Sequence, residues 1–125
     1  MLTAIDHIEI IVRDLDAYIA YLEKLGFEVL TRTSHHGQSA ELKLPGDNQP
    51  IFELHEVGGE EVIGINHIAF RTDDVNAAYD SLAKTDIRIE EPPHDVASTG
   101  RTNINLRDPD GWRVQIVDAN RRKPL

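Results

Sequence analysis

The 125-residue sequence contains no cysteine, which excludes a disulfide framework and thiolate chemistry. It is also poor in positive charge, with 13 basic residues against 22 acidic ones and a formal net charge of -9. Nucleic-acid binding depends on basic side chains that displace counterions from phosphates, so we do not expect a nucleic-acid partner. Apolar runs extend over only a few residues, far below the roughly 20 that a membrane-spanning helix needs.

The N-terminal residues, Met1 to Ala4, lack the basic and apolar regions of a secretory signal. Together these absences predict a soluble, cytoplasmic protein with no membrane partner. A chain of this length is expected to form one domain, residues 1–125, with its own hydrophobic core.

The most informative feature that is present is an internal repeat. Residues 5–15 align without a gap with residues 65–75, and the alignment places His7 over His67. Further matches at the same spacing are Ala17 with Ala77, Leu22 with Leu82, and Lys24 with Lys84. A repeat of this kind predicts two related half-domains. Because imidazole is the commonest protein ligand for transition metals, the two histidines are candidate metal ligands.

The halves are expected at residues 1–60 and 61–120, and hydrophobic periodicity predicts the same order of elements in both. The first half contains a strand at 4–12, a helix at about 15–25 and strands at 27–33, 39–44 and 51–57. The second contains a strand at 65–72, a helix at about 74–84 and strands at 87–90, 102–107 and 112–118. Local signals add a helix N-cap at Asp14, a C-cap glycine at Gly26, exposed loop residues at His35 and His36, a loop at Pro92 and Pro93, a hairpin turn at 108–111 and a frayed tail at 121–125.

Each half is therefore predicted to be β-α-β-β-β, in the α+β class. Side chains two residues apart on a strand share a face of the sheet, and this alternation gathers the polar residues on one face. These residues include His7 with Glu9, Glu53 with His55, Ser39 with Glu41, His67 with Arg71, Gln115 with Arg113, and Arg101, Asn103, Asn105 and Arg107 together. The opposite face is mostly apolar and is expected to pack against the helices. A polar face of this kind is costly unless it binds a ligand or water.

Four segments carry a more specific signal: residues 5–8 (Ile-Asp-His-Ile), 51–54 (Ile-Phe-Glu-Leu), 66–70 (Asn-His-Ile-Ala-Phe) and 108–117 (Asp-Pro-Asp-Gly-Trp-Arg-Val-Gln-Ile-Val). With these segments the chain resembles the vicinal oxygen chelate superfamily, from about Ala4 to Asp118. That superfamily includes glyoxalase I, methylmalonyl-CoA epimerase, extradiol dioxygenases and bleomycin-resistance proteins. The resemblance is strongest to its glyoxalase–epimerase branch.

The resemblance implies two βαβββ modules whose curved mixed sheets surround a metal-binding cup. The family's ligand positions fall on His7, Glu53, His67 and Gln115. A mixed nitrogen and oxygen set of this kind suits a divalent first-row ion, namely Zn, Ni, Co, Mn or Fe. The implied reaction is proton transfer next to a carbonyl through a metal-bound enediolate, catalysed by a lyase of the glyoxalase I type or an isomerase of the acyl-CoA epimerase type.

Glu53 is the candidate general base as well as a ligand, and Glu41 and His55 are the alternative bases. Candidates for orienting a small anionic or carbonyl-containing substrate are Arg71, Asn103 and Arg113. Small members of this family commonly dimerise, so the resemblance also implies a homodimer.

Three departures from bacterial glyoxalase I count against the glutathione hemithioacetal as substrate. Ile11 and Val57 replace residues that contact glutathione, and Gln115 replaces the glutamate that abstracts the proton. Compared with methylmalonyl-CoA epimerase, the carboxylate and amide ligands have exchanged halves. Two alternatives stay open, a non-haem Fe(II) dioxygenase of the same superfamily and a non-catalytic binding protein of the bleomycin-resistance type.

Overall fold

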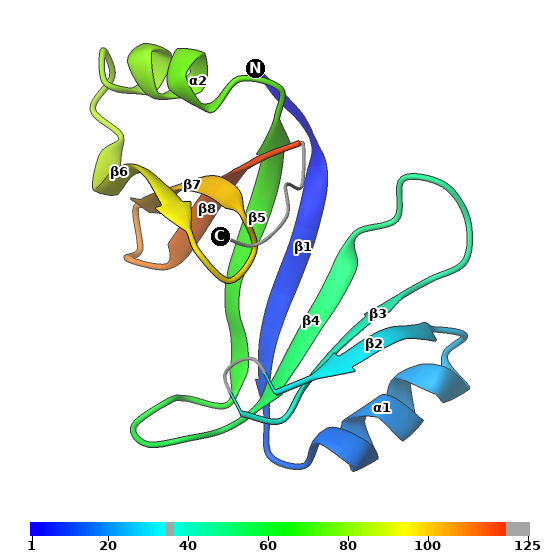
Figure 1. The fold of residues 1–125 in the computed structure, drawn as a ribbon. Coiled ribbons are helices and arrows are strands. Elements are labelled where there is room, and N and C mark those ends of the chain that lie inside the picture. The colour runs from blue at the N-terminus through cyan, green and yellow to red at the C-terminus, as the bar shows by residue number, and fades with distance from the viewer. Residues whose placement is uncertain (35–36, 120–125) are drawn as a thin grey trace. The chain divides into compact units, whose positions relative to one another are not determined.

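The computed structural model describes residues 1–34 and 37–119, so His35, His36 and the tail 121–125 lie outside the described residues. The described residues form eight strands and two helices, in the predicted order β-α-β-β-β twice (Figure 1). The first repeat comprises β1 (Leu2–Val12), α1 (Leu15–Lys24), β2 (Glu28–Thr33), β3 (Ser39–Lys43) and β4 (Ile51–Glu56). The second comprises β5 (Gly64–Thr72), α2 (Val75–Leu82), β6 (Arg88–Val96), β7 (Arg101–Arg107) and β8 (Arg113–Asp118). Neither helix in the described ranges is long and apolar enough to cross a membrane.

The chain divides into two compact units, and the division falls inside β1. The first unit is His7–Asn66, and the second combines Met1–Asp6 with His67–Leu125. The first six residues therefore group with the second repeat, whereas the sequence repeat places them in the half 1–60.

In the first unit the strands lie in the order β2-β3-β4-β1. β4 runs parallel to β1 and antiparallel to β3, and β3 runs antiparallel to β2. Helix α1 packs against the apolar face of this sheet, as the strand alternation predicted (Figure 1). The core consists of Ile10, Val12, Leu15, Ile19, Leu22, Ala40, Leu42 and Leu54.

Helix α1 begins and ends where its sequence signals predicted. The Asp14 side chain accepts a hydrogen bond from the Ala17 backbone N–H at 3.0 Å, which satisfies one of the helix's unpaired donors. At the other end Gly26 has a φ of +102°, a left-handed conformation that glycine adopts without strain. Its N–H donates to the carbonyl of Glu23 at 3.0 Å, while Phe27 N–H donates to that of Leu22 at 3.1 Å, which together form a Schellman motif.

The second unit repeats this arrangement with the strand order β5-β8-β7-β6. β5 and β8 are parallel, as β1 and β4 are, and β7 is antiparallel to both of its neighbours. Helix α2 covers the apolar face with a core of Val75, Leu82, Ile104, Leu106 and Ile116. The predicted hairpin turn joins β7 to β8, with Asp108 Oδ1 accepting from the N–H groups of Asp110 and Trp112 at 2.9 and 2.8 Å.

Strand β6 differs from the prediction. It extends from Arg88 to Val96 and includes Pro92 and Pro93, so the loop predicted at the two prolines was wrong. β6 is the last strand in its order, and its register against β7 shifts between Ile89 and Glu91 and again between Glu91 and His94. Prolines are tolerated in a strand at a sheet edge and at bulges, where no ladder N–H is lost.

Candidate functional site

Three glutamates lie side by side across the sheet of the first unit. Glu41 of β3 is directly opposite Glu53 of β4, which is directly opposite Glu9 of β1. Like charges in such positions, about 5 Å apart, destabilise a sheet. The side chains are also partly removed from water, at 13% exposure for Glu9 and 33% for Glu53. This carboxylate row, Glu9, Glu41 and Glu53, therefore favours positive charge beside it.

His7 lies next to the carboxylate row and is 6% exposed. It is opposite Ile51 in the parallel pair of β1 and β4, and Glu53 is two residues further along β4. Its Nε2 atom is 3.7 Å from Glu53 Oε2. Two donors that are each about 2 Å from an ion can be up to about 4 Å apart, so this pair fits a common metal ion.

His55 is held between two carboxylates. Its Nδ1 is 2.9 Å from Glu9 Oε1 and its Nε2 is 2.8 Å from Glu61 Oε2. A neutral imidazole has one N–H donor and one acceptor nitrogen, so both contacts are hydrogen bonds if an imidazolium donates to both carboxylates or if one carboxyl group is protonated and donates to the ring. The His55 side chain is 7% exposed and that of Glu61 is 39% exposed. Glu9, His55 and Glu61 therefore form a continuous polar path from the carboxylate row to the surface of this unit.

Hydrogen bonds keep the outer end of this path negatively charged. The bond from His55 is the largest cause that lowers the pKa of Glu61, and the bond from the Gly58 backbone N–H lowers it further. Burial acts in the opposite direction but is outweighed. Glu61 Oε1 accepts a hydrogen bond from the Gly58 backbone N–H at 2.9 Å, and the other carboxylate oxygen, Oε2, contacts His55.

The second unit holds the other two predicted ligands in the same relationship. His67 of β5 is 6% exposed and lies opposite Arg113 of β8. Gln115 is two residues further along β8, opposite Ala69. His67 and Gln115 are thus diagonal neighbours on parallel strands, as His7 and Glu53 are. The repeat seen in the sequence reproduces one histidine and one oxygen donor in each unit.

The predicted four-ligand set takes two residues from each unit, and it stays a prediction. No group of three or more His, Asp or Glu side chains positioned to hold a metal occurs within residues 1–34 and 37–119. The argument that these residues could bind a metal therefore rests on the chemistry of the two pairs, imidazole with carboxylate and imidazole with amide. Both combinations suit first-row divalent ions better than calcium or magnesium.

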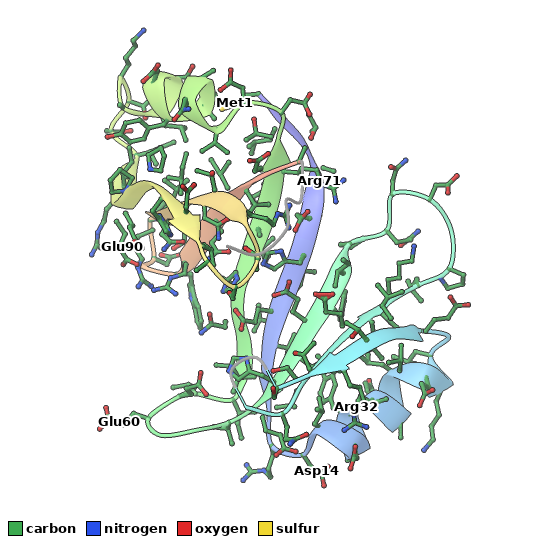
Figure 2. The ribbon with its side chains drawn as sticks, viewed as in Figure 1. Met1, Asp14, Arg32, Glu60, Arg71 and Glu90 are labelled. Carbon is green, nitrogen blue, oxygen red and sulfur yellow. The ribbon has the colours of Figure 1, made fainter. Side chains whose placement is uncertain are left out.

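The three candidate substrate-binding residues all lie in the second unit. Arg71 of β5 (Figure 2) is 34% exposed, and its Nε and Nη2 atoms are both 3.0 Å from Asp6 Oδ1. Asn103 is opposite Val117, which is itself opposite Arg71. Arg113 donates from Nη2 to Glu90 Oε1 at 3.2 Å. Their roles toward a substrate stay predictions.

Asp6 and Arg101 form a buried ion pair that the sequence did not predict. Arg101 Nη1 and Nη2 are each 2.8 Å from an oxygen of Asp6, and the two residues are 8% and 4% exposed. Nη2 also donates to the carbonyl of Asp118 at 2.6 Å. The sequence shows only that Asp6 is an acidic residue among apolar ones, which hints at a buried partner. No local pattern connects Asp6 to Arg101, which is 95 residues further along the chain.

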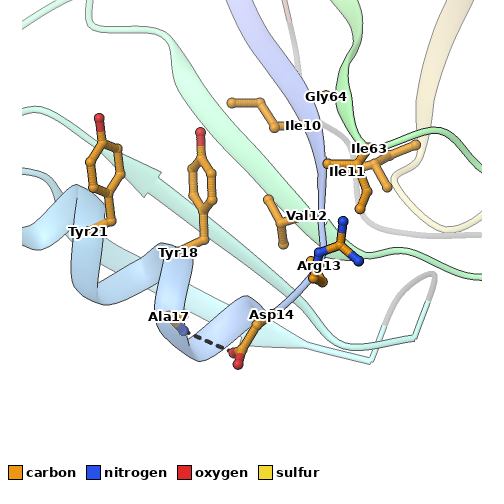
Figure 3. A pocket seen from close by; sticks show the side chains of 10 residues that line it. All are labelled: Ile10, Ile11, Val12, Arg13, Asp14, Ala17, Tyr18, Tyr21, Ile63 and Gly64. Carbon is orange, nitrogen blue, oxygen red and sulfur yellow. Dashed lines mark hydrogen bonds between the residues drawn. The ribbon is translucent and has the colours of Figure 1, made fainter.

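A groove of about 550 Å³ lies elsewhere in the first unit. Apolar residues of β1, including Ile10 and Val12, line it together with Ile63 and the rings of Tyr18 and Tyr21 on α1 (Figure 3). The two rings contact each other edge to face, with centroids 5.7 Å apart. None of the predicted site residues lines this groove.

Comparison with known families identifies the class of protein. Residues 4–116 match the model of the Glyoxalase/Bleomycin resistance protein/Dioxygenase superfamily, so the chain belongs to that superfamily. The family predicted from the sequence is confirmed.

Solved structures similar to this chain include methylmalonyl-CoA epimerases. A single-residue variant of the Streptomyces coelicolor enzyme, in complex with 2-nitronate-propionyl-CoA, is 27% identical, with 99% of this chain and 100% of that one covered and a TM-score of 0.76. A methylmalonyl-CoA epimerase in complex with methylmalonyl-CoA and NH4+ is 28% identical, with the same coverage and TM-score. The epimerase from Mycobacterium tuberculosis is 20% identical, with 95% of this chain and 89% of that one covered. Its TM-score of 0.76 shows that the two share the fold.

A curated relative is the uncharacterized protein YwbC of Bacillus subtilis. It is 30% identical over 123 residues, which cover 93% of this chain and 98% of YwbC. The similarity to epimerases over the full chain confirms the predicted α+β fold class.

Proposed function

We propose that the protein is a divalent-metal-dependent isomerase or lyase that moves a proton next to a carbonyl, with an acyl-CoA thioester as substrate. The observation that carries this proposal is the carboxylate row beside His7, on the same face as the predicted ligand pair. Carboxylates side by side destabilise a sheet unless positive charge compensates them. They are useful where a cation and a proton must be held.

The metal would be held by His7 and Glu53 from the first unit and by His67 and Gln115 from the second. Two imidazoles, a carboxylate and an amide suit Zn, Ni, Co, Mn or Fe, as the family resemblance implies. When bound, a divalent ion supplies Lewis-acid stabilisation of negative charge on the substrate's carbonyl oxygen.

The proton would be removed by a carboxylate of the row. Glu53 is the first candidate, Glu41 directly opposite it is the second, and His55 is the third. Epimerisation removes a proton from one side of a carbon atom and returns one to the other side. A row with more than one acid–base group meets that need better than a single carboxylate does.

An acyl-CoA substrate is favoured over the glutathione adduct for two reasons. The similar solved structures include epimerases in complex with CoA thioesters, at 27% and 28% identity. In addition, Ile11 is only 1% exposed and Val57 uses its backbone N–H to bind the carbonyl of Val12 at 2.8 Å. Neither side chain offers the polar contact that glutathione binding would use.

The test combines metal analysis with proton exchange. Protein purified without a chelator or His-tag is analysed for bound metals, and deuterium incorporation from D2O into methylmalonyl-CoA is followed by mass spectrometry. We expect bound divalent metal, and exchange that is lost on chelation and restored by metal. Bound iron with oxygen uptake on catechols would favour the dioxygenase alternative, and ligand binding without exchange would favour a binding protein.

A further inference from the structure

Three buried polar atoms on one face of the second unit have no hydrogen-bond partner within the described residues. They are Asn103 Oδ1, Asn105 Oδ1 and Arg113 Nε. Asn105 is 6% exposed, so water reaches it poorly. Buried polar groups are normally paired, so each one left unpaired calls for an explanation, such as a catalytic role or a bound water or ion. The two oxygens are acceptors and the guanidinium nitrogen is a donor.

Two consecutive glutamates of β6 orient two of these side chains, Asn105 and Arg113. The register of β6 against β7 shifts between Ile89 and Glu91, so the extra residue, Glu90 (Figure 2), also reaches the neighbouring strands. Glu90 pairs with Arg107 Nε and with Arg113 Nη2, the latter at 3.2 Å. The Nε atom of Arg113 is left for another partner.

Glu91 orients the side chain of Asn105 through a hydrogen bond. Its Oε2 accepts from Asn105 Nδ2 at 2.8 Å, and a carboxylate can only accept from the amide nitrogen. The orientation of the Asn105 amide is therefore fixed, with Oδ1 as the atom that still needs a donor. The bulge in β6 thus presents one free acceptor and one free donor on the same face.

The spacing of these two residues suits a chemical group with a donor and an acceptor on opposite sides. Asn105 is directly opposite Gln115, and Arg113 is two residues from Gln115 on β8, so Asn105 and Arg113 are diagonal neighbours. Diagonal neighbours lie about 7–8 Å apart in an antiparallel pair. A secondary amide carries its N–H and C=O on opposite sides and can bond both atoms at about 2.9 Å each.

We propose that Asn105 and Arg113 form a subsite for a secondary amide of the ligand, as found in the cysteamine end of a pantetheine thioester. Asn105 Oδ1 accepts from the amide N–H, and Arg113 Nε donates to the amide carbonyl. This inference rests on the proposed function, since Gln115 between the two residues is a predicted ligand. In a pantetheine thioester the amide is separated from the sulfur by only two methylene groups, so it lies near the reacting carbonyl.

The test uses two small thioesters that differ by one group. S-propionyl-N-acetylcysteamine has the amide, and S-(2-acetoxyethyl) thiopropionate replaces its N–H by oxygen while keeping the carbonyl. Their affinities for the metal-loaded full chain are measured by titration calorimetry. We expect the amide to bind at least about tenfold more tightly, because an unpaired buried acceptor rejects a ligand that lacks the donor.

Variants separate the two contacts. Asn105→Leu should abolish the preference for the amide, whereas Arg113→Met should weaken both probes by a similar factor, since both have the carbonyl. Asn105→Asp combined with Glu91→Gln keeps an acceptor at position 105 and should retain the preference. The urea midpoint of Asn105→Leu should be unchanged or higher, because Glu91, whose side chain is 51% exposed, can be solvated by water.

Equal binding of the two probes by the unmodified protein, or a preference that persists in Asn105→Leu, would overturn the subsite. If deuterium exchange into methylmalonyl-CoA is intact in that case, the proposed function stands without the subsite. If neither probe binds and no exchange occurs, both the subsite and the acyl-CoA substrate class are wrong.

Discussion

Glu53 of β4 lies directly opposite Glu41 of β3. Two carboxylates in this position repel each other unless a cation or a proton lies between them. A bound metal ion would use the negative charge of Glu53, whereas in the metal-free protein that charge lies opposite Glu41 and 3.7 Å from His7 Nε2. Glu53 is therefore expected to stabilise the metal-bound protein and to destabilise the metal-free one.

Glu53→Gln tests this double role, because it preserves shape and an oxygen donor but removes charge and basicity. Bound metal should fall moderately, and deuterium exchange should fall by the roughly 10²–10⁴ that losing a general base costs. The metal-free variant should unfold at a higher urea concentration. Glu23→Gln, on the exposed side of α1, is the matched control and should change none of the three. Unchanged exchange with metal retained would assign the base to Glu41 or His55.

Gln115→Glu tests the ligand on the other unit. A carboxylate is a stronger donor to a divalent ion than an amide, so metal should bind more tightly and glyoxalase I activity should rise. Metal affinity is measured by competition with a chromogenic chelator. Asn103→Asp adds the same charge to the same sheet face at a position that is not a predicted ligand. Equal changes in the two variants would show a general charge effect and remove Gln115 from the ligand set.

Activity on the methylglyoxal–glutathione adduct is expected to be weak in the unmodified protein. Gln115 cannot accept a proton at neutral pH, and Ile11 is buried at 1% exposure where a glutathione-binding arginine is usual. We expect kcat/KM for the adduct to be lower than for methylmalonyl-CoA by about 10² or more, because the site lacks both the carboxylate at position 115 that the adduct's reaction uses and the polar contacts to glutathione. Robust turnover of the adduct would mean that these replacements do not exclude glutathione.

The sequence predicted those features that depend on neighbouring residues. The order of strands and helices, the N-cap at Asp14 and the turn at 108–111 follow from local periodicity and turn chemistry. The extension of β6 through Pro92 did not, because a strand tolerates proline only at an edge, and the edge is set by the order of distant strands.

Side-chain pairing was harder to predict than strand position. Alternation placed Glu9 and His55 each on the polar face, but it could not show that His55 bridges Glu9 and Glu61. Whether two side chains meet depends on strand register and rotamer as well as on which face they share.

The buried Asp6–Arg101 pair gives a prediction on stability. Asp6→Asn leaves Arg101, at 8% exposure, without its counter-charge, so the free energy of unfolding should fall by about 3–5 kcal/mol. Urea denaturation measures the change. Arg71→Gln should cost less, under about 1 kcal/mol, because that side chain is 34% exposed. Combining Asp6→Leu with Arg101→Met should recover much of the loss, since no buried charge then remains unpaired.

The contact of Glu61 with His55 predicts a pH dependence of stability. The hydrogen bonds from His55 and from the Gly58 N–H lower the pKa of Glu61 below its ordinary value of 4.5. A carboxylate whose pKa is lower in the folded state stabilises the fold above its unfolded pKa, and this contribution is lost as the pH falls through the folded value. Because the side chain is 39% exposed, the contribution should be about 1 kcal/mol or less.

Glu61→Gln removes this dependence, so the useful quantity is the difference in unfolding free energy between the unmodified protein and the variant. We expect that difference to be constant between pH 6 and pH 5 and to shrink as the pH is lowered below 4.5, the ordinary pKa of the group. Glu60→Gln, at the neighbouring exposed glutamate, is the control for a change of charge in the same loop. A difference that grows as the pH falls would require the pKa of Glu61 to be raised by folding, and His55 would then not be its hydrogen-bond donor.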